Sequence, residues 1–165
     1  MRRVQWIVFC RRYNIAMSFT TLAPENHARL RADLTDTTWC VACLCAAWCD
    51  VCGNFRDSYA ALAAQHPQIQ FVWIDIEDEA NLVGDIDVDN FPTLLIQRGS
   101  QVAFFGTVEP DAKAIGRLLQ SQMRHVNATD ADASPALIAL PSSATATKSN
   151  HGLDLRARLD AHLNP

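Results

Sequence analysis

Hydrophobic positions follow two different patterns on either side of Cys49. Residues 37–47 include an unbroken run of small apolar side chains, which is typical of a strand buried on both faces. Residues 52–65 instead carry aromatic and leucine side chains at helical spacing among several alanines, which predicts a helix that ends before Pro67. The sequence therefore predicts a buried central strand that leads directly into a helix.

Weaker patterns predict the elements before and after this pair. Residues 69–76 are rich in β-branched and aromatic side chains, so they complete a strand–helix–strand unit whose strands we expect to be parallel. A short glycine-containing loop at 98–100 indicates an antiparallel hairpin. The full prediction adds an edge strand at 18–22, helices at 24–34, 77–84 and 110–125, and hairpin strands at 93–97 and 101–105.

Both ends of the chain lack the periodicity of the centre. Residues 1–17 are predicted to be a disordered leader with Met17 as the natural start, because the short apolar stretch is followed by two arginines rather than a cleavage site. The remainder divides into a domain at 18–126 and a segment at 127–165, which begins as an Ala-, Ser- and Thr-rich linker. Spaced leucines predict a short amphipathic helix at 153–163, which docks on the domain, pairs with a partner or has no role.

Composition narrows the class of protein. The chain has 165 residues, 49% hydrophobic and 19% charged, which suits one domain with a tail, and no apolar run reaches membrane-spanning length. Residues 17–126 hold seven basic and fourteen acidic residues. This balance lacks the basic footprint of a nucleic-acid-binding protein, so we expect neither nucleic acid nor membrane as a partner.

Five of the six cysteines lie between residues 40 and 52. A secreted disulfide framework would spread its cysteines to join distant loops, and neighbours along one strand are poorly placed to bridge each other. We therefore interpret most of them as reduced thiols in a reducing compartment, and we expect a cytoplasmic location.

Cys49 and Cys52 are placed for chemistry, because they lie where the buried strand passes into the helix. Helix N-termini carry unpaired amide N–H groups and a partial positive charge, which favour the thiolate of a nearby cysteine. The two-residue spacer lets both cysteines occupy the first turn and close a small disulfide ring. One thiol can attack a foreign disulfide, and the other can resolve the mixed disulfide.

The cysteines, histidines and acidic residues also allow other interpretations. A zinc site would need Cys40, Cys43, Cys49 and Cys52 to converge, but a strand points Cys40 and Cys43 to opposite faces, so no metal is expected. Cys40, Cys43 and Cys45 are predicted to be small core residues, although Cys45 lies close to the predicted catalytic turn and a regulatory role is the alternative. The five histidines are predicted to lie at the surface, and the acidic segment 75–89 is predicted to be a solvated face.

A Trp-Cys-x-x-Cys motif between a buried strand and a helix, followed by a strand, a helix and a hairpin, resembles the thioredoxin family. Phe91, Pro92 and Thr93 lie just before the hairpin, where that family has a cis-proline followed by threonine. The resemblance covers about residues 18–125. It implies an α/β thioredoxin fold, with a central mixed four- to five-stranded sheet flanked by helices and a disordered or loosely docked C-terminal extension.

The resemblance also implies roles for individual residues. Cys49 corresponds to the exposed attacking thiol and Cys52 to the more buried resolving thiol. Pro92 is inferred to be cis, and the backbone at Phe91 to pair with the substrate chain. Gly106 corresponds to the family's glycine after the last strand. The residues implied in substrate binding are Trp48, Phe91, Pro92, Thr93 and Gly106.

Two departures from the family pattern concern ionisation. Asp50 and Val51 replace the usual Gly-Pro between the cysteines, and Asp50 places a negative charge beside Cys49 that disfavours the thiolate. Cys43 stands where the family has a buried Asp, and Trp73 stands where it has the partner Lys. A buried thiol is a poor base, so we expect Asp50 and Cys43 to modulate the ionisation of the pair and to slow its reaction.

The expected function is thiol–disulfide exchange that reduces protein disulfides. Its expected partners are disulfide-containing proteins and a reductase that restores the dithiol, and it needs no cofactor. The alternative is a thioredoxin-like binding or adaptor domain with weak or no redox activity, which the lost Asp–Lys pair favours. A periplasmic oxidant or isomerase is a third possibility that requires export.

Overall fold

The computed structural model describes residues 19–86, 88–131 and 154–165. The sequence-based expectations for the leader and for most of the linker lie outside these residues. The strands are β1 (Phe19–Thr21), β2 (Trp39–Cys45), β3 (Gln70–Asp75), β4 (Thr93–Arg98) and β5 (Gln101–Thr107). The helices are the 3-10 turn η1 (Pro24–Asn26), α1 (His27–Asp33), α2 (Asp50–Ala64), α3 (Ala80–Val83), α4 (Ala112–Ala131) and α5 (Leu155–Leu163).

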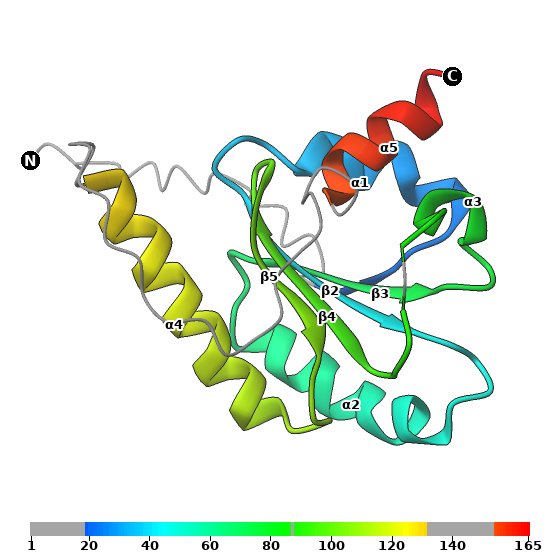
Figure 1. The fold of residues 1–165 in the computed structure, drawn as a ribbon, viewed down its shortest axis with the longest axis horizontal. Helices are drawn as coiled ribbons and strands as arrows, with labels where there is room; N and C mark the ends of the chain where they lie inside the picture. Colours follow the sequence, from blue (N-terminus) through cyan, green and yellow to red (C-terminus); the bar gives the residue numbers. More distant parts are fainter. Residues whose placement is uncertain (1–18, 87, 132–153) are drawn as a thin grey trace, which may run out of the picture.

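The five strands form one mixed sheet in the order β1-β3-β2-β4-β5 (Figure 1). β1, β3 and β2 run parallel, whereas β4 and β5 form an antiparallel hairpin against β2. This arrangement confirms the predicted α/β fold class, with β1 at the edge and β2 at the centre. Thr93 at the start of β4 pairs with Leu44 near the end of β2, which brings the Pro92 loop beside the turn that holds Cys49.

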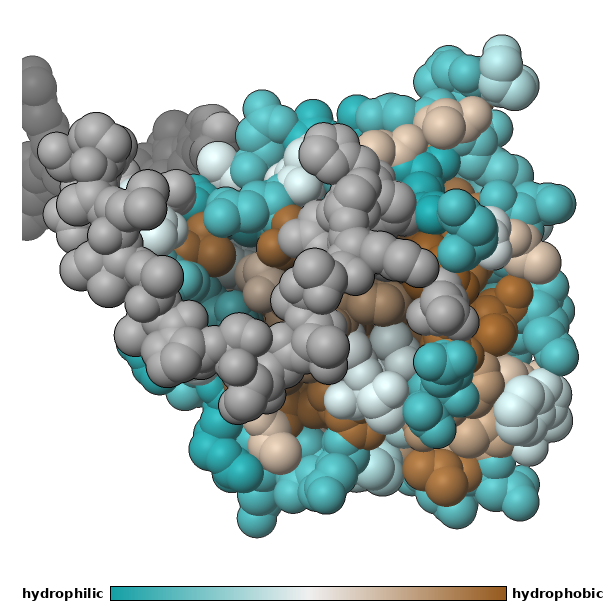
Figure 2. All heavy atoms as spheres, in the orientation of Figure 1, coloured by the Kyte–Doolittle hydropathy of each residue, from teal (hydrophilic) through white to brown (hydrophobic). Residues whose placement is uncertain are grey.

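Every side chain of β2 is buried, as the apolar run predicted, because helices cover both faces of the sheet. One face packs against α2 and α4 and holds the odd-numbered positions of β2, including Cys43 and Cys45. The other packs against α1, α3 and α5 and holds Cys40, Ala42 and Leu44. Figure 1 shows these layers, and Figure 2 shows hydrophobic residues near the middle of the visible face, surrounded by hydrophilic ones.

Tyr59 of α2 fixes the helix against the central strands. Its ring is fully buried, and its hydroxyl donates to the carbonyl oxygens of Val41 at 2.9 Å and Val72 at 3.4 Å. Burial of the phenol raises the pKa of Tyr59 well above its ordinary value, so the hydroxyl keeps its proton and remains a donor. This anchor sets the position of the helix whose first turn carries the candidate chemistry.

Residues 127–131 continue α4, so the prediction that the linker begins at residue 127 is wrong. Val126 is buried in the core on the α2 side of the sheet, so the helix is still held by packing at this point. The hydroxyl of Thr129 donates back to the Val126 carbonyl at 2.8 Å. The Ala- and Thr-rich composition of this segment resembles that of a linker. Alanine nevertheless favours a helix, so the segment extends α4 once packing has formed the preceding turns.

The C-terminal helix α5 is docked on the domain rather than loosely attached. Leu155 and Leu159 are buried in the core on the α1 side of the sheet. Asp154 caps the helix by accepting from the amide of Arg156 at 2.9 Å. The buried Gln97 side chain of β4 donates to Asp154 at 3.1 Å and accepts from the Leu155 amide at 3.0 Å. The leucine spacing predicted the helix, but these polar contacts fix where it docks.

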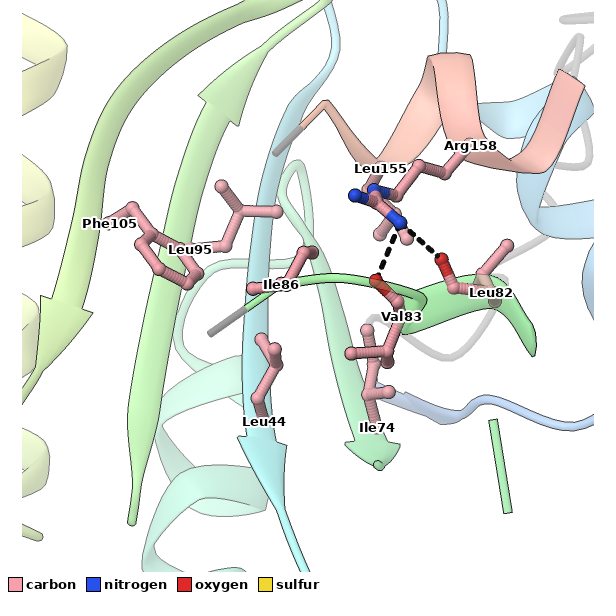
Figure 3. Close-up of a pocket in the computed structure, with 9 residues that line it drawn as sticks. All are labelled: Leu44, Ile74, Leu82, Val83, Ile86, Leu95, Phe105, Leu155 and Arg158. Atoms are coloured by element: carbon pink, nitrogen blue, oxygen red, sulfur yellow. Dashed lines mark hydrogen bonds between the residues drawn. The ribbon is translucent and has the colours of Figure 1, made fainter. Parts of the chain in front are cut away.

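Side chains at the rim complete this docking. Arg158 donates to the carbonyl oxygens of Leu82 and Val83 at the end of α3, beside a small apolar pocket under α5 (Figure 3). Ion pairs within the described residues also join α5 to the domain: Arg31 with Asp160, Arg156 with Asp36, and Arg158 with Asp85.

His27 is buried, so the prediction that every histidine lies at the surface is wrong. Its side chain and that of Glu79 are almost fully buried, and His27 Nε2 lies 2.8 Å from Glu79 Oε2. Glu79 is likewise an exception to the predicted solvated acidic face. The helical spacing already placed His27 on one face with Leu30 and Leu34, and that face packs against the sheet.

No helix in the described ranges combines the length and apolarity needed to cross a bilayer.

Candidate active site

Cys49 is the N-cap residue of α2, and its thiol is free and half-buried. The amide of Cys52 points at Cys49 Sγ from 3.4 Å. An N–H group aimed at sulfur, together with the positive end of the helix, stabilises a thiolate at this position. Cys49 is the residue to which the resemblance gives the attacking role.

Cys52 is buried and forms a disulfide with Cys45 instead of Cys49. Cys45 ends β2 with its side chain on the α2 side of the sheet, and Cys52 points back toward it from the first turn of α2. Their Cα atoms are 6.1 Å apart, within the range that a disulfide spans. The expected Cys49–Cys52 ring is therefore not the bond present, and Cys45 is not merely a small core residue.

Cys43 lies behind this disulfide on the same face of β2. Its sulfur is 3.7 Å from Cys45 Sγ. Cys45 is bonded to Cys52 and has no S–H, so the Cys43 thiol is the hydrogen-bond donor. Burial, with a smaller contribution from the charge of Cys49, raises the pKa of Cys43 to about 12. Cys43 is therefore a thiol at neutral pH and cannot act as the base that a buried Asp would provide.

Cys40 lies on the opposite face of the sheet from Cys43, as strand alternation predicted. Burial raises the pKa of Cys40 to about 12 as well. The four cysteines of the zinc reading therefore do not converge. In the part of the chain that the structure describes, no three His, Cys, Asp or Glu side chains are arranged to hold a metal ion.

The peptide bond between Phe91 and Pro92 is cis, as the resemblance implied. Pro92 and Thr93 are buried, and the Thr93 hydroxyl donates to the Asn90 carbonyl at 2.7 Å, which shapes the loop before β4. Gly106 was expected after the last strand, but it lies within β5, opposite Leu94 of β4. The hairpin extends one residue beyond it because Thr107 still pairs with Thr93.

Trp48 joins the cysteine turn to the proline loop. Its indole is 65% exposed, and the ring packs edge-on against Phe91 with centroids 5.5 Å apart. The indole N–H donates to Glu77 Oε1 at 3.0 Å. Val51, in the first turn of α2, is also exposed, so apolar side chains reach the surface on both sides of Cys49 in the chain. Glu77 was not singled out from the sequence, because only the fold places it against Trp48.

The positions that replace the family's Asp and Lys are neighbours, since Cys43 and Trp73 pair across β2 and β3. A cation also lies at this position: the guanidinium of Arg56 of α2 is over the Trp73 ring, 5.1 Å from its centroid. It is held there by a 2.6 Å hydrogen bond to Thr21. Asp50 is exposed in the first turn of α2, close to Cys49 in the chain. The site thus carries acidic groups at its rim and a thiol where the family has a carboxylate.

A thioredoxin family model matches residues 20–121, which run from within β1 to the middle of α4 and include the whole site. This chain belongs to the thioredoxin family. Thioredoxin H5 from Oryza sativa subsp. japonica is 32% identical to it over 56 residues, which are 34% of this chain and 42% of the rice protein. The aligned part therefore spans less than half of that thioredoxin.

Solved thioredoxin structures share the fold at lower identity. Spinach chloroplast thioredoxin F (short form) is 17% identical with a TM-score of 0.55, covering 66% of this chain and 96% of its own. A poplar thioredoxin h is 17% identical with a TM-score of 0.56, covering 64% and 96%. Mitochondrial thioredoxin 3 from Saccharomyces cerevisiae is 19% identical with a TM-score of 0.51, covering 63% and 95%. These similarities concern the thioredoxin fold.

Proposed function

We propose that this thioredoxin-family protein is a thiol–disulfide oxidoreductase that reduces protein disulfides, with Cys49 as the attacking thiol and Cys52 as the resolving thiol. The observation that carries the proposal is the half-exposed thiol of Cys49 at the cap of α2, with the buried Cys52 one turn along the helix. Helix caps of this kind favour the thiolate, and the thiolate is the nucleophile of disulfide exchange.

The reaction begins when the Cys49 thiolate attacks one sulfur of a target disulfide. A Cys49–target bond forms, and the other target sulfur leaves as a thiolate that takes a proton from water. The Cys52 thiolate then attacks Cys49, which releases the second target thiol and leaves an oxidised Cys49–Cys52 pair. A reductase supplies the two electrons that restore the dithiol. This cycle requires Cys52 to enter as a thiol, with its bond to Cys45 open.

The surface around Cys49 supports docking of an extended, partly apolar segment of the target. Trp48 and Phe91 present exposed or half-exposed rings, and Val51 adds an exposed aliphatic side chain. The target backbone would pair with the backbone that precedes the cis bond. Its contacts would then be with Phe91, Pro92 and Thr93, and with Gly106 on the neighbouring strand. Asp50 and Glu77 at the rim oppose the thiolate and favour basic targets.

An insulin-reduction assay with dithiothreitol tests this function. We expect the wild-type protein to accelerate insulin precipitation and Cys49→Ser to lose that acceleration. Cys40→Ser is the matched control, because it also removes one thiol but lies on the far face of the sheet. Wild type that precipitates insulin no faster than dithiothreitol alone would show that the protein is not a reductase, and equal acceleration by Cys49→Ser would show that Cys49 is not the attacking thiol.

A binding or adaptor role is the second candidate. It is favoured by the replacement of the buried Asp and its Lys partner with Cys43 and Trp73, which leaves no carboxylate to accept the Cys52 proton. Three free thiols among the described residues support a reducing location, which we propose to be cytoplasmic. Wild-type and Cys49→Ser proteins that bind the same targets with equal affinity, and reduce none, would favour the adaptor role.

A further inference from the structure

Four cysteines meet at one end of β2: Cys43, Cys45, Cys49 and Cys52. Cys45 and Cys52 share a disulfide, and each is about 1% exposed. Cys43 is fully buried behind Cys45, with 3.7 Å between their sulfurs. Cys49 packs against the same cluster and is the only one of the four with substantial solvent contact. A foreign disulfide or reductant can therefore reach the buried bond only through Cys49.

We propose that Cys45 is a third redox-active cysteine, which takes the Cys52 sulfur over from Cys49 and returns Cys49 to the free thiol. The proposal rests on the assignment of Cys49 as the attacking thiol. It adds that the oxidised protein holds its disulfide inside the core, between β2 and α2, rather than at the surface.

The exchange needs no outside oxidant or reductant. The Cys45 thiolate attacks Cys52 Sγ in the Cys49–Cys52 disulfide, so the Cys45–Cys52 bond forms and the Cys49–Cys52 bond breaks. Cys49 leaves as a thiolate, and the proton lost by Cys45 is balanced by the one that Cys49 takes up. One disulfide and one thiol are present before and after, so no electrons enter or leave the protein.

The surroundings of the three sulfurs favour the buried bond. The exchange consumes the buried thiol of Cys45 and moves the disulfide from the half-buried Cys49 into the core, where a neutral disulfide has no charge to desolvate. The sulfur released is Cys49, where the Cys52 amide and the end of α2 stabilise a thiolate. When the bond reopens, the leaving Cys45 sulfur is met by the thiol of Cys43, which keeps its proton in the core.

The two disulfide states differ in what Cys49 can do. With the Cys45–Cys52 bond closed, Cys49 can still attack a target, but Cys52 cannot release it, so the target stays bound as a mixed disulfide. With that bond open, Cys52 completes the reduction. Cys45 thereby switches the protein between holding a target and releasing it.

Differential alkylation of the full-length protein tests the inference. Reduced protein is oxidised with glutathione disulfide at neutral pH and quenched with acid at intervals. Free thiols are then blocked with N-ethylmaleimide in denaturant, and the remaining disulfide is reduced and labelled with iodoacetamide. We expect peptide mass spectra of fully oxidised wild type to show iodoacetamide on Cys45 and Cys52, and N-ethylmaleimide on Cys49. A final disulfide between Cys49 and Cys52, with Cys45 blocked by N-ethylmaleimide, would overturn the proposal.

Two variants test the route. In Cys45→Ala the iodoacetamide label should appear on Cys49 and Cys52, whereas the control Cys40→Ala should give the same labelling pattern as wild type. In Cys49→Ser the buried disulfide should not have formed at the time when wild type is fully oxidised, and equally fast formation would overturn the proposal. These readouts are separate from activity. Insulin reduction that survives Cys49→Ser refutes the assignment of Cys49 as the attacking thiol, whereas a Cys49–Cys52 map in an active protein refutes only the role of Cys45.

Discussion

Replacing Leu159 with alanine tests whether α5 is an integral part of the fold. The Leu159 side chain is 0% exposed, whereas Leu163, one turn later in the same helix, is 38% exposed. Both substitutions remove the same three carbons and leave a strong helix former, so they differ mainly in burial. At about 0.8 kcal/mol per buried CH₂, the transfer contribution at Leu159 is roughly 2.4 kcal/mol.

An incompletely filled cavity adds to this, and buried Leu→Ala changes typically cost about 2–5 kcal/mol in total. We expect Leu159→Ala to lose about 2–4 kcal/mol of unfolding free energy, since α5 can partly relax toward the space, and Leu163→Ala to lose less than about 1 kcal/mol. Urea unfolding followed by circular dichroism measures both. With a typical urea m-value of about 1–3 kcal/mol/M, the midpoint difference is on the order of 1 M.

The two variants must be compared in the same cysteine oxidation state, because a disulfide changes the unfolded chain. If Leu159→Ala lost no more stability than Leu163→Ala, the helix would not be packed against α1 and the sheet. The burial of Leu159 and the contacts of Gln97 with the start of α5 would then be contradicted together.

The remaining predictions concern the site and the ion pairs of α5. Asp50→Asn should speed the iodoacetamide alkylation of Cys49 at neutral pH, because a negative charge beside the thiolate is removed; an unchanged rate would show that Asp50 does not control its ionisation. Trp48→Ala should slow insulin reduction but not the reduction of a small aromatic disulfide, since only the protein substrate needs the docking surface; equal loss with both would contradict that role. The hydrogen bond from Arg31 lowers the pKa of Asp160 below its ordinary value of 3.8, so the contact stabilises docking above that value and is lost as pH falls through the lowered pKa. The protection of α5 amides from exchange, relative to an unfolded chain at the same pH, should therefore fall in acid, and Asp160→Asn should already show less protection at neutral pH; equal protection in both proteins at neutral pH would contradict this.

The sequence was sufficient to predict the elements that build the site. The unbroken apolar run identified the buried central strand, and the glycine loop identified the hairpin, because both patterns report burial or turn chemistry over a few neighbouring residues. Strand alternation also separated Cys40 from Cys43 correctly. The location of the candidate site was predicted from the Trp-Cys-x-x-Cys motif and from Pro92, and the structure brings both to one end of the sheet.

Features that depend on contacts between distant segments were missed or misread. The pairing of Cys45 with Cys52 depends on how the first turn of α2 faces the end of β2, whereas spacing alone favoured Cys49. The sequence did contain a clue to the role of Cys45, because Cys45 shares a strand face with Cys43 and lies next to the turn that holds Cys49. His27 was misassigned although its helical face was known. The docking of α5 depends on Gln97, a polar residue in an apolar strand, and that polarity was the available clue.

Covalent trapping tests the central claim most directly. In Cys52→Ser the resolving thiol is absent, so an attack by Cys49 on insulin should stop at a mixed disulfide that dithiothreitol reverses. Intact-mass measurement should give one adduct per chain, and peptide mapping should place it on Cys49. No adduct, or an adduct carried by a different cysteine, would contradict the assignment of Cys49 as the nucleophile.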